Sequence, residues 1–317
     1  MPPTISVLIT YYNERELLTE CLRSLLEQGP APEEIIIYDD ASYYPASNYV
    51  QIDVPVRIIR GATTIRPACG RNLLLREARF DYVHFHDTDD LFLSGWLPQV
   101  TNKIRTTAAD LVLTEVSTFS EGRLVSERVL GLDRIRATDD LVEFALQGAI
   151  LTSSGVILRK AALTIGGFRE TLHQAEDFDF YVRLAASGVT AAVLTEPIIR
   201  KENRADSYSS REQGVVWASV VDAVRQLADE LPARYRSNLA DKAAYAGSQL
   251  FKLGARHTAS EAFQLARHLG PPTYARQRRS YRLLASALGP EAAEWISLGY
   301  RRLLPEPLRR ALVQRGL

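Results

Sequence analysis

Short β-branched runs alternate with helical periodicity over the first part of this chain. The apolar runs are "ISVLI" at 5–9, "EIIIY" at 34–38, "VRIIR" at 56–60 and "YVHFH" at 82–86. Between them, leucines recur at helical spacing in 17–26, and a second helix is predicted near 69–79. Strands that are apolar on both faces and alternate with helices predict a mostly parallel sheet covered on both sides. The predicted fold class is therefore α/β.

Polar clusters directly follow three of these strands. They are "TYYNE" at 10–14, "DDAS" at 39–42 and "DTDD" at 87–90. In a parallel sheet the carboxyl ends of the strands meet at one edge, and ligands bind in the crevice formed there. We therefore expect the three clusters to converge on one site.

Composition excludes several classes of protein. Lys plus Arg and Asp plus Glu both number 38, so the overall charge gives no reason to expect a nucleic-acid partner. Two cysteines, Cys21 and Cys69, predict neither a disulfide framework nor a Cys-rich metal site, and they fit a cytoplasmic location. No signal peptide and no run of about 18 apolar residues is recognisable, so we expect no membrane span.

The chain changes character near residue 210. Acidic residues exceed basic ones by about eight in residues 1–210, and the reverse holds for 211–317. The strand pattern fades at the same point, and segments such as "VVWASVVDAVRQLADEL" have helical periodicity. We predict a catalytic α/β domain over 1–210 and a helical region over 211–317 that contacts an acceptor, a membrane surface or a second chain.

The stretch "DTDD" places Asp87, Asp89 and Asp90 at the end of a strand. Carboxylates crowded in this way repel one another unless a cation neutralises them, and oxygen ligands select Mg²⁺ or Mn²⁺. Such an ion commonly keeps open positions for substrate phosphates. The alternative is a solvated Asp-rich turn.

Five stretches, in order, resemble the GT-A family 2 glycosyltransferases. They are "ISVLITYYNERELLTECLRSLLEQ", "EIIIYDDAS", "GRNLLLREARFDYVHFHDTDD", "SSGVILRKAALTIGGF" and "EDFDFYVRLAASG", and together they span residues 4 to about 210. The resemblance implies a GT-A fold and an inverting transferase that moves a sugar from a nucleotide-diphospho-sugar to an acceptor hydroxyl. Such a reaction requires neutralisation of the leaving diphosphate and removal of the hydroxyl proton.

The resemblance assigns the acidic residues of these motifs. "DTDD" occupies the place of the DxD motif, so Asp89 and Asp90 are expected to hold the divalent cation, and Asp87 is expected to face the sugar or ribose. "EDFDF" matches the ED motif at the start of a helix, where Asp177 aligns with the general base and Glu176 would orient the acceptor or the base. The alternative for Glu176 and Asp177 is a favourable interaction with the helix N-terminus.

The nucleotide is expected to lie on the first two loops, where the resemblance places Thr10, Tyr12 and Asp40 around the base. Tyr11 is the alternative aromatic residue, because neighbours after a strand point in opposite directions.

Two arginines are expected to contribute positive charge. Arg71 is expected near the nucleotide, with a surface salt bridge as the alternative. Arg200, or Arg204 in its place, falls in the segment that often closes over the diphosphate in this family.

Two departures from the family pattern bear on the substrate. "DDASYYPAS" at 39–47 has Ala41 where the family usually has Gly, which leaves the nucleotide open, although a UDP-sugar is our first expectation. A QxxRW signature is not recognisable, so we expect one sugar per binding event, in bacterial polysaccharide or glycoconjugate synthesis with a saccharide or lipid-linked acceptor. The competing classes are an inactive scaffold of the same fold and a nucleotidyltransferase, whose Gly-rich basic loop is replaced here by "TYYNERE".

The C-terminal region carries two basic segments with interleaved apolar residues, "YARQRRSYR" at 274–282 and "YRRLLPEPLRR" at 300–310. Both could lie on the anionic inner face of a membrane and bring the enzyme to a lipid-linked acceptor. The alternatives are a solvated helix face and a homodimer contact.

Overall fold

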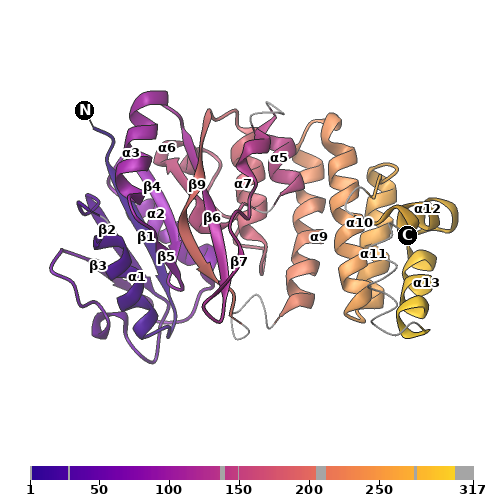
Figure 1. Cartoon of the computed structure of the whole chain (residues 1–317), viewed down its shortest axis with the longest axis horizontal. Coiled ribbons are helices and arrows are strands. Elements are labelled where there is room, and N and C mark those ends of the chain that lie inside the picture. Colours follow the sequence, from indigo (N-terminus) through magenta and orange to yellow (C-terminus); the bar gives the residue numbers. More distant parts are fainter. Residues whose placement is uncertain are drawn as a thin grey trace. The chain divides into compact units, whose positions relative to one another are not determined.

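The computed structural model describes residues 2–27, 29–135, 140–148, 150–204, 212–274 and 277–303. The chain divides into two compact units, Met1–Arg211 and Glu212–Leu317. The first unit combines a sheet with helices, and the second is helical (Figure 1).

The described part of the first unit holds a nine-stranded sheet. Its strands are β1 (Ile5–Tyr11), β2 (Glu34–Asp39), β3 (Arg57–Arg60), β4 (Tyr82–Asp87), β5 (Asp90–Phe92), β6 (Leu111–Ser120), β7 (Arg123–Ser126), β8 (Gly155–Leu158) and β9 (Ala191–Glu202). The order is β3-β2-β1-β4-β8-β6-β9-β5, and β7 pairs with β6. β1 to β4 pair in parallel as expected, whereas β8 is antiparallel to both β4 and β6, so the sheet beyond β4 is mixed.

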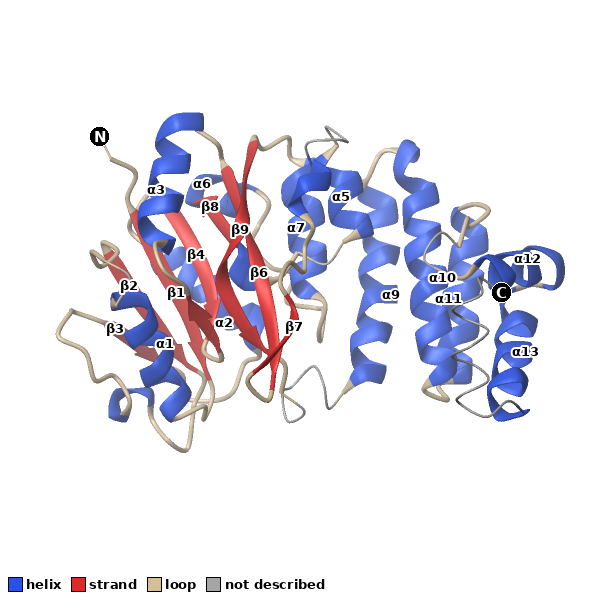
Figure 2. Cartoon of the chain, in the orientation of Figure 1, coloured by secondary structure: helices blue, strands red, loops and turns tan. Residues whose placement is uncertain are grey.

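Helices cover both faces of this sheet (Figure 2). They are α1 (Glu16–Leu26), α2 (Pro67–Glu77), α3 (Trp96–Thr107), α5 (Leu141–Gln147), α6 (Arg159–Thr164) and α7 (Glu176–Ala186). Short 3-10 turns occupy Ala46–Asn48, Leu132–Arg134 and Thr152–Ser154. In Figure 2, α1 and α3 lie in front of the sheet and α2 and α6 behind it. Because both faces are covered, β1, β2 and β4 are buried along nearly their whole length, as their unbroken apolar runs predict.

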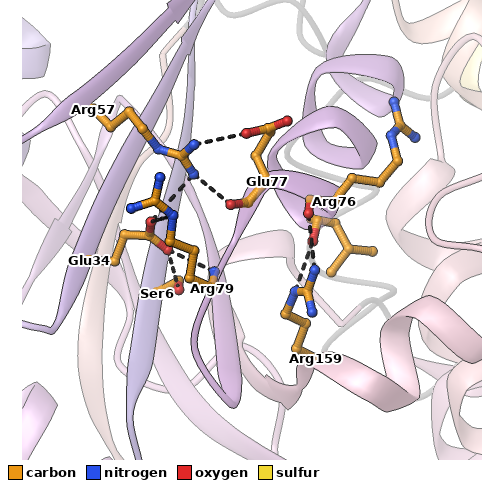
Figure 3. Close-up of polar contacts among 8 residues, drawn as sticks. Ser6, Glu34, Arg57, Arg76, Glu77, Arg79 and Arg159 are labelled. Atoms are coloured by element: carbon orange, nitrogen blue, oxygen red, sulfur yellow. Dashed lines mark hydrogen bonds and ion pairs between the residues drawn. The ribbon is translucent and has the colours of Figure 1, made fainter.

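Arginine side chains fix the C-terminal end of α2 (Figure 3). Arg159 donates to the backbone oxygens of Leu75 (3.2 Å) and Arg76 (3.0 Å), and Arg57 donates to that of Glu77 (2.5 Å). The last carbonyls of a helix lack partners within the helix, and cations there also interact favourably with its dipole. α2 is therefore held at one end by charge, while its first turns face the carboxyl ends of the strands.

The second unit contains α9 (Gln213–Glu230), α10 (Arg236–Lys252), α11 (Arg256–Leu269), α12 (Arg279–Leu288) and α13 (Pro290–Leu303), with a 3-10 turn at Ala233–Tyr235. α10 packs on α9, α11 and α13. Its buried face is rich in small residues, among them Ala240, Ala243 and Gly247, which allow the helices to approach closely. The helical nature of the C-terminal region is thus as predicted. None of the described helices is long and apolar enough to cross a membrane.

Gly70 of α2 allows this helix to lie close to the sheet. A Cβ atom at Gly70 would lie 2.8 Å from Cδ1 of Tyr38 and 3.3 Å from Cγ2 of Thr10. Both neighbours are on strands, so neither can move far without shifting the sheet.

We predict that Gly70→Ala destabilises the protein by about 1–3 kcal/mol, the usual cost of overpacking a core. Gly214→Ala is the matched control, because a Cβ on this helical glycine meets nothing within 4 Å. Urea unfolding followed by circular dichroism measures both variants. Equal stability of the two would show that α2 has room to move off the sheet.

Candidate active site

The carboxyl ends of β1 and β4 lie side by side, with Thr10 opposite Asp87 in the register. Thr88 donates to the Thr10 carbonyl (2.9 Å), and the Asp40 N–H donates to the Tyr11 carbonyl (3.0 Å). The order β2-β1-β4 reverses the direction of chain progression at this point, which is where open α/β sheets bind ligands. The three polar clusters therefore meet as the sequence predicts.

The loop after β1 separates the two neighbouring tyrosines. Tyr11 is fully buried, and its hydroxyl donates to the Tyr44 carbonyl (2.7 Å). Tyr12 keeps 53% of its surface exposed. Of this pair, only Tyr12 has a ring free to stack on a ligand.

Asp39 and Asp40, at the end of β2, have different hydrogen-bond partners. Asp39 accepts from the backbone N–H groups of Ser42 and Ala46 (both 2.9 Å) and so fixes the loop. Asp40 accepts from the Ile65 N–H (2.7 Å), and burial raises the pKa of its carboxyl above the ordinary value. Asp40 is thus a buried carboxylate beside the end of β1, whereas Asp39 is occupied by the backbone.

Arg71 links the DTDD motif at 87–90 to the ED motif at 176–177. Its guanidinium is almost fully buried and donates to Asp87 Oδ1 (2.7 Å) and Glu176 Oε1 (2.6 Å). Burial alone would lower the pKa of Arg71, but the two carboxylates raise it above the ordinary value, and Arg71 in turn lowers the pKa of Asp87 against the effect of burial. The structure therefore places Arg71 in a buried bridge between two acidic side chains, so it does not form the surface salt bridge that was the alternative.

The carboxylates of "DTDD" have different surroundings. Asp90 is fully buried and accepts from the Ser153 hydroxyl and from Lys201 Nζ (3.3 Å). Asp89 is half-buried, and burial, with added repulsion from Asp90 and Asp87, raises its pKa to about 6. We expected Asp89 and Asp90 to act alike, but the structure encloses Asp90 within the protein.

Asp89 lines a pocket of about 260 Å³ together with Thr88, Leu91, Arg200 and Arg204. The Arg200 guanidinium lies over the Phe119 ring (4.0 Å) and forms an ion pair with Glu202 (3.3 Å). Glu20 and Glu202 also line it, so three acidic residues and two arginines surround one pocket, and both signs of charge suit a cation and an anionic group bound together.

The side chains fit a cation that is shared with a substrate. Within the described ranges, no group of three His, Cys, Asp or Glu side chains is arranged to hold a metal ion. Mg²⁺ is commonly held by one or two carboxylates and by the phosphates of its substrate. Asp89 has a raised pKa and lines the pocket, so it is a carboxylate that would be stabilised by such an ion. Glu14 is a second one, because burial, with repulsion from Asp89 and Asp87, raises its pKa to about 7.

The ED motif opens helix α7. Glu176 is its first residue, and Asp177 is half-buried with its Oδ1 accepting from the Phe178 N–H (2.7 Å). Burial, followed by repulsion from Glu176, raises the pKa of Asp177 to about 6. A carboxyl with this pKa is ionised at neutral pH and can accept a proton more readily than a solvated Asp.

Sequence reasoning missed Lys201 as a site residue and did not link Ser153 to Asp90. Lys201 follows Arg200 on β9, and the sequence offered a signal in the two adjacent cations of "RKEN". Asp90, Asp87 and Asp89 all raise the pKa of Lys201 above its ordinary value, so it stays positively charged beside them.

Comparison with solved structures defines the class of fold. The chain resembles residues 1–349 of TarS from S. aureus, crystallised in complex with UDP-GlcNAc, with a TM-score of 0.68 and 18% sequence identity. The match covers 96% of this chain and 93% of that chain. The fold is that of the GT-A glycosyltransferases, with C-terminal helices in addition.

Sequence comparison places the chain within that class. A model of the family described as "Glycosyl transferase family 2" matches residues 6–165, slightly more than half of the chain. The uncharacterized glycosyltransferase YwdF of Bacillus subtilis is 26% identical over 225 residues, which are 70% of this chain and 83% of YwdF. The amylovoran biosynthesis glycosyltransferase AmsB of Erwinia amylovora is 24% identical over 260 residues, 74% of this chain and 85% of AmsB. This chain belongs to glycosyl transferase family 2.

We predict that the Asp89 carboxyl makes the metal-free protein more stable near pH 5 than near pH 7.5, so that Asp89→Asn raises the melting temperature at pH 7.5 relative to that at pH 5 by a few degrees. The folded-state pKa values of Asp89 and Asp177 (about 6) and of Glu14 (about 7) exceed the unfolded values. At these three carboxyls the folded state binds protons more tightly, so their contribution to stability falls as pH rises through this window. His84 and His86 act in the opposite direction over the same window, because burial lowers the pKa of both imidazoles, that of His86 to about 4, and the unfolded state therefore binds more protons below about pH 6.5. The lowered pKa of Asp87 opposes the carboxyls only below about pH 4.

Scanning calorimetry with EDTA and with Mn²⁺ measures this dependence. Mn²⁺ should stabilise the protein more near pH 7.5 than near pH 5, because protons compete for the same carboxylate. Asp89→Asn should lose most of that difference. The same pH dependence of melting temperature in Asp89→Asn and in the wild type would contradict the prediction.

Proposed function

We propose that this chain is a metal-dependent, inverting glycosyltransferase that moves a sugar from a UDP-sugar to a hydroxyl of a saccharide or glycoconjugate. The proposal rests on the Arg71 bridge. Arg71 pairs with Asp87 of the DTDD motif and with Glu176, which is next to the candidate base Asp177. A transferase needs its donor and acceptor groups held in one fixed geometry.

On the donor side, Asp89 would hold the divalent cation, and Asp90 would keep the motif in place through Ser153 and Lys201. When bound, Mg²⁺ or Mn²⁺ would neutralise the charge that develops on the leaving diphosphate. Arg200, which lines the pocket beside Asp89, would contribute further positive charge to the same group. Asp87 would orient the sugar while Arg71 holds its carboxylate.

On the acceptor side, Asp177 would accept the proton of the attacking hydroxyl. The hydroxyl oxygen forms a bond to the anomeric carbon, the bond from that carbon to the phosphate oxygen breaks, and its electron pair leaves with the nucleoside diphosphate. Attack from the face opposite the diphosphate inverts the anomeric centre. Glu176, held by Arg71, would orient the acceptor and keep the pKa of Asp177 raised.

The nucleotide would lie over the ends of β1 and β2. Tyr12 offers an exposed ring for stacking, and Asp40 offers a buried carboxylate that can accept the imide hydrogen of uracil, with Thr10 beside them. The TarS complex with UDP-GlcNAc supports a uridine donor for this fold. The name of AmsB supports a role in polysaccharide synthesis. Transfer of one sugar per binding event and a cytoplasmic location remain predictions.

Calorimetric titration of UDP, dTDP and GDP, each with Mn²⁺ and with EDTA, tests the donor side. UDP should bind tightly only with Mn²⁺. Binding of GDP alone would replace the uridine assignment, and binding of no nucleotide would favour an inactive scaffold of the same fold.

We predict that Asp177→Asn keeps Mn²⁺-dependent UDP binding and slows sugar transfer by a factor on the order of 10²–10⁴, the usual contribution of a general base. The wild-type rate should fall about tenfold per pH unit below about pH 6, as the base becomes protonated. Asp53→Asn, at an exposed residue, is the matched control. Transfer at the wild-type rate by Asp177→Asn would rule out the base assignment.

We predict that substitutions of Asp89 and Asp90 have different effects. Asp89→Asn should stay folded and lose Mn²⁺-dependent UDP binding, because its carboxylate is the proposed ligand. Asp90→Asn should lose about 3–5 kcal/mol of stability, because it leaves the charge of Lys201 without its partner. Calorimetry and urea unfolding separate these outcomes, and the reverse pattern would exchange the two roles.

A further inference from the structure

Helix α13 exposes apolar side chains and buries an acidic one. Trp295, Ile296 and Tyr300 are 58%, 45% and 44% exposed. On the opposite side, Glu294 is buried and accepts from the Ser248 hydroxyl of α10. The solvent side of an ordinary amphipathic helix carries charged or polar residues. α13 instead exposes Ile296, Tyr300 and part of Trp295, whose ring also lies against the Phe251 ring (5.4 Å) and the Arg256 guanidinium (4.9 Å).

Helix α12 adds positive charge and a further apolar residue. Arg279 and Arg282 are exposed, and neither forms an ion pair within the described part of the chain. Leu283, beside them, is 67% exposed. The sequence of α12, "RSYRLLASAL", contains no acidic residue.

These two helices contact each other and lie at the end of the helical unit farthest from α9 (Figure 1). Arg309 and Arg310, in the second basic segment of the sequence, lie outside the described residues.

We propose that the α12–α13 surface, made of Arg279, Arg282, Leu283, Trp295, Ile296 and Tyr300, docks on an anionic lipid surface. Tryptophan and tyrosine favour the membrane–water interface, and leucine and isoleucine can insert below the headgroups. The unpaired arginines match the negative charge of such a surface. This inference does not rest on the proposed reaction, and it would place the enzyme where a lipid-linked acceptor is found.

A second copy of the chain fits this surface less well than a lipid surface does. A two-fold contact brings the same patch of both copies together. Arg279 and Arg282 would then approach their equivalents without a carboxylate between them. The described acidic residues of α13 are already engaged, because Glu291 pairs with Arg267 (3.4 Å) and Glu294 is buried.

Sedimentation of the full chain with vesicles tests the proposal. Binding is expected to vesicles that contain phosphatidylglycerol and not to phosphatidylcholine alone, and high salt should weaken it. Arg279→Glu with Arg282→Glu should lower affinity on the order of 30-fold or more, since each basic residue contributes roughly fivefold. Leu283→Ser with Ile296→Ser should also release the protein.

Matched controls make equal changes at exposed residues elsewhere. Arg123→Glu with Arg236→Glu reverses the same charge on β7 and α10, and Leu124→Ser with Val125→Ser removes apolar groups from β7. Both should bind like the wild type. Circular dichroism melting confirms that each variant is folded.

Trp295→Phe keeps an aromatic ring and gives a second measurement. Brominated lipids should quench the fluorescence of the wild type on binding, and this quenching should be largely lost in Trp295→Phe although the variant still sediments with vesicles. Absence of vesicle binding by the wild type at low salt overturns the proposal. So does a lipid-independent dimer that dissociates when Leu283 and Ile296 become Ser, because a second copy then covers this surface.

Discussion

The site depends on one buried cation between two carboxylates. Arg71 comes from α2, Asp87 ends β4 and Glu176 begins α7, so three elements that are far apart in sequence meet at a single guanidinium. Burying an unpaired arginine or carboxylate is costly, and each of these groups is acceptable in the interior only because the others are present. The position of the ED motif relative to the DTDD motif is therefore set by charge neutralisation, with α2 anchored at its far end by Arg57 and Arg159.

The same principle explains why three carboxylates can crowd the end of β4. Arg71 neutralises Asp87 and Lys201 neutralises Asp90, so two of the three charges are compensated by the protein itself. Asp89 is left half-buried with a raised pKa and forms no ion pair in the described structure, although the charge of Lys201 partly offsets the effect of burial. Under the proposed function, Asp89 is therefore the carboxylate that would bind the external divalent ion, and Asp87 and Asp90 would position it.

The sequence predicted the elements and their convergence better than the partners of individual side chains. Alternating periodicities predict the first strands and helices because burial on both faces imposes them. Arg71 was expected near the nucleotide, but its pairing with Asp87 and Glu176 could not be predicted, because it depends on how closely α2 approaches the sheet. Arg200 and Lys201 are neighbours on β9, so they point to opposite faces, and only the strand register decides which one meets Asp90.

Backbone strain gathers at the same loops. Ala41 after β2, Arg66 before α2 and Ala175 before α7 all have positive φ values, of 56°, 74° and 59°. Left-handed conformations of residues other than glycine persist only where the surrounding contacts hold them. Asp39 supplies two such contacts to the loop of Ala41, which explains how this chain tolerates alanine where its family usually has glycine. These strained residues lie beside Asp40, Arg71 and Asp177, so the loops that present the proposed site residues are held by contacts of this kind.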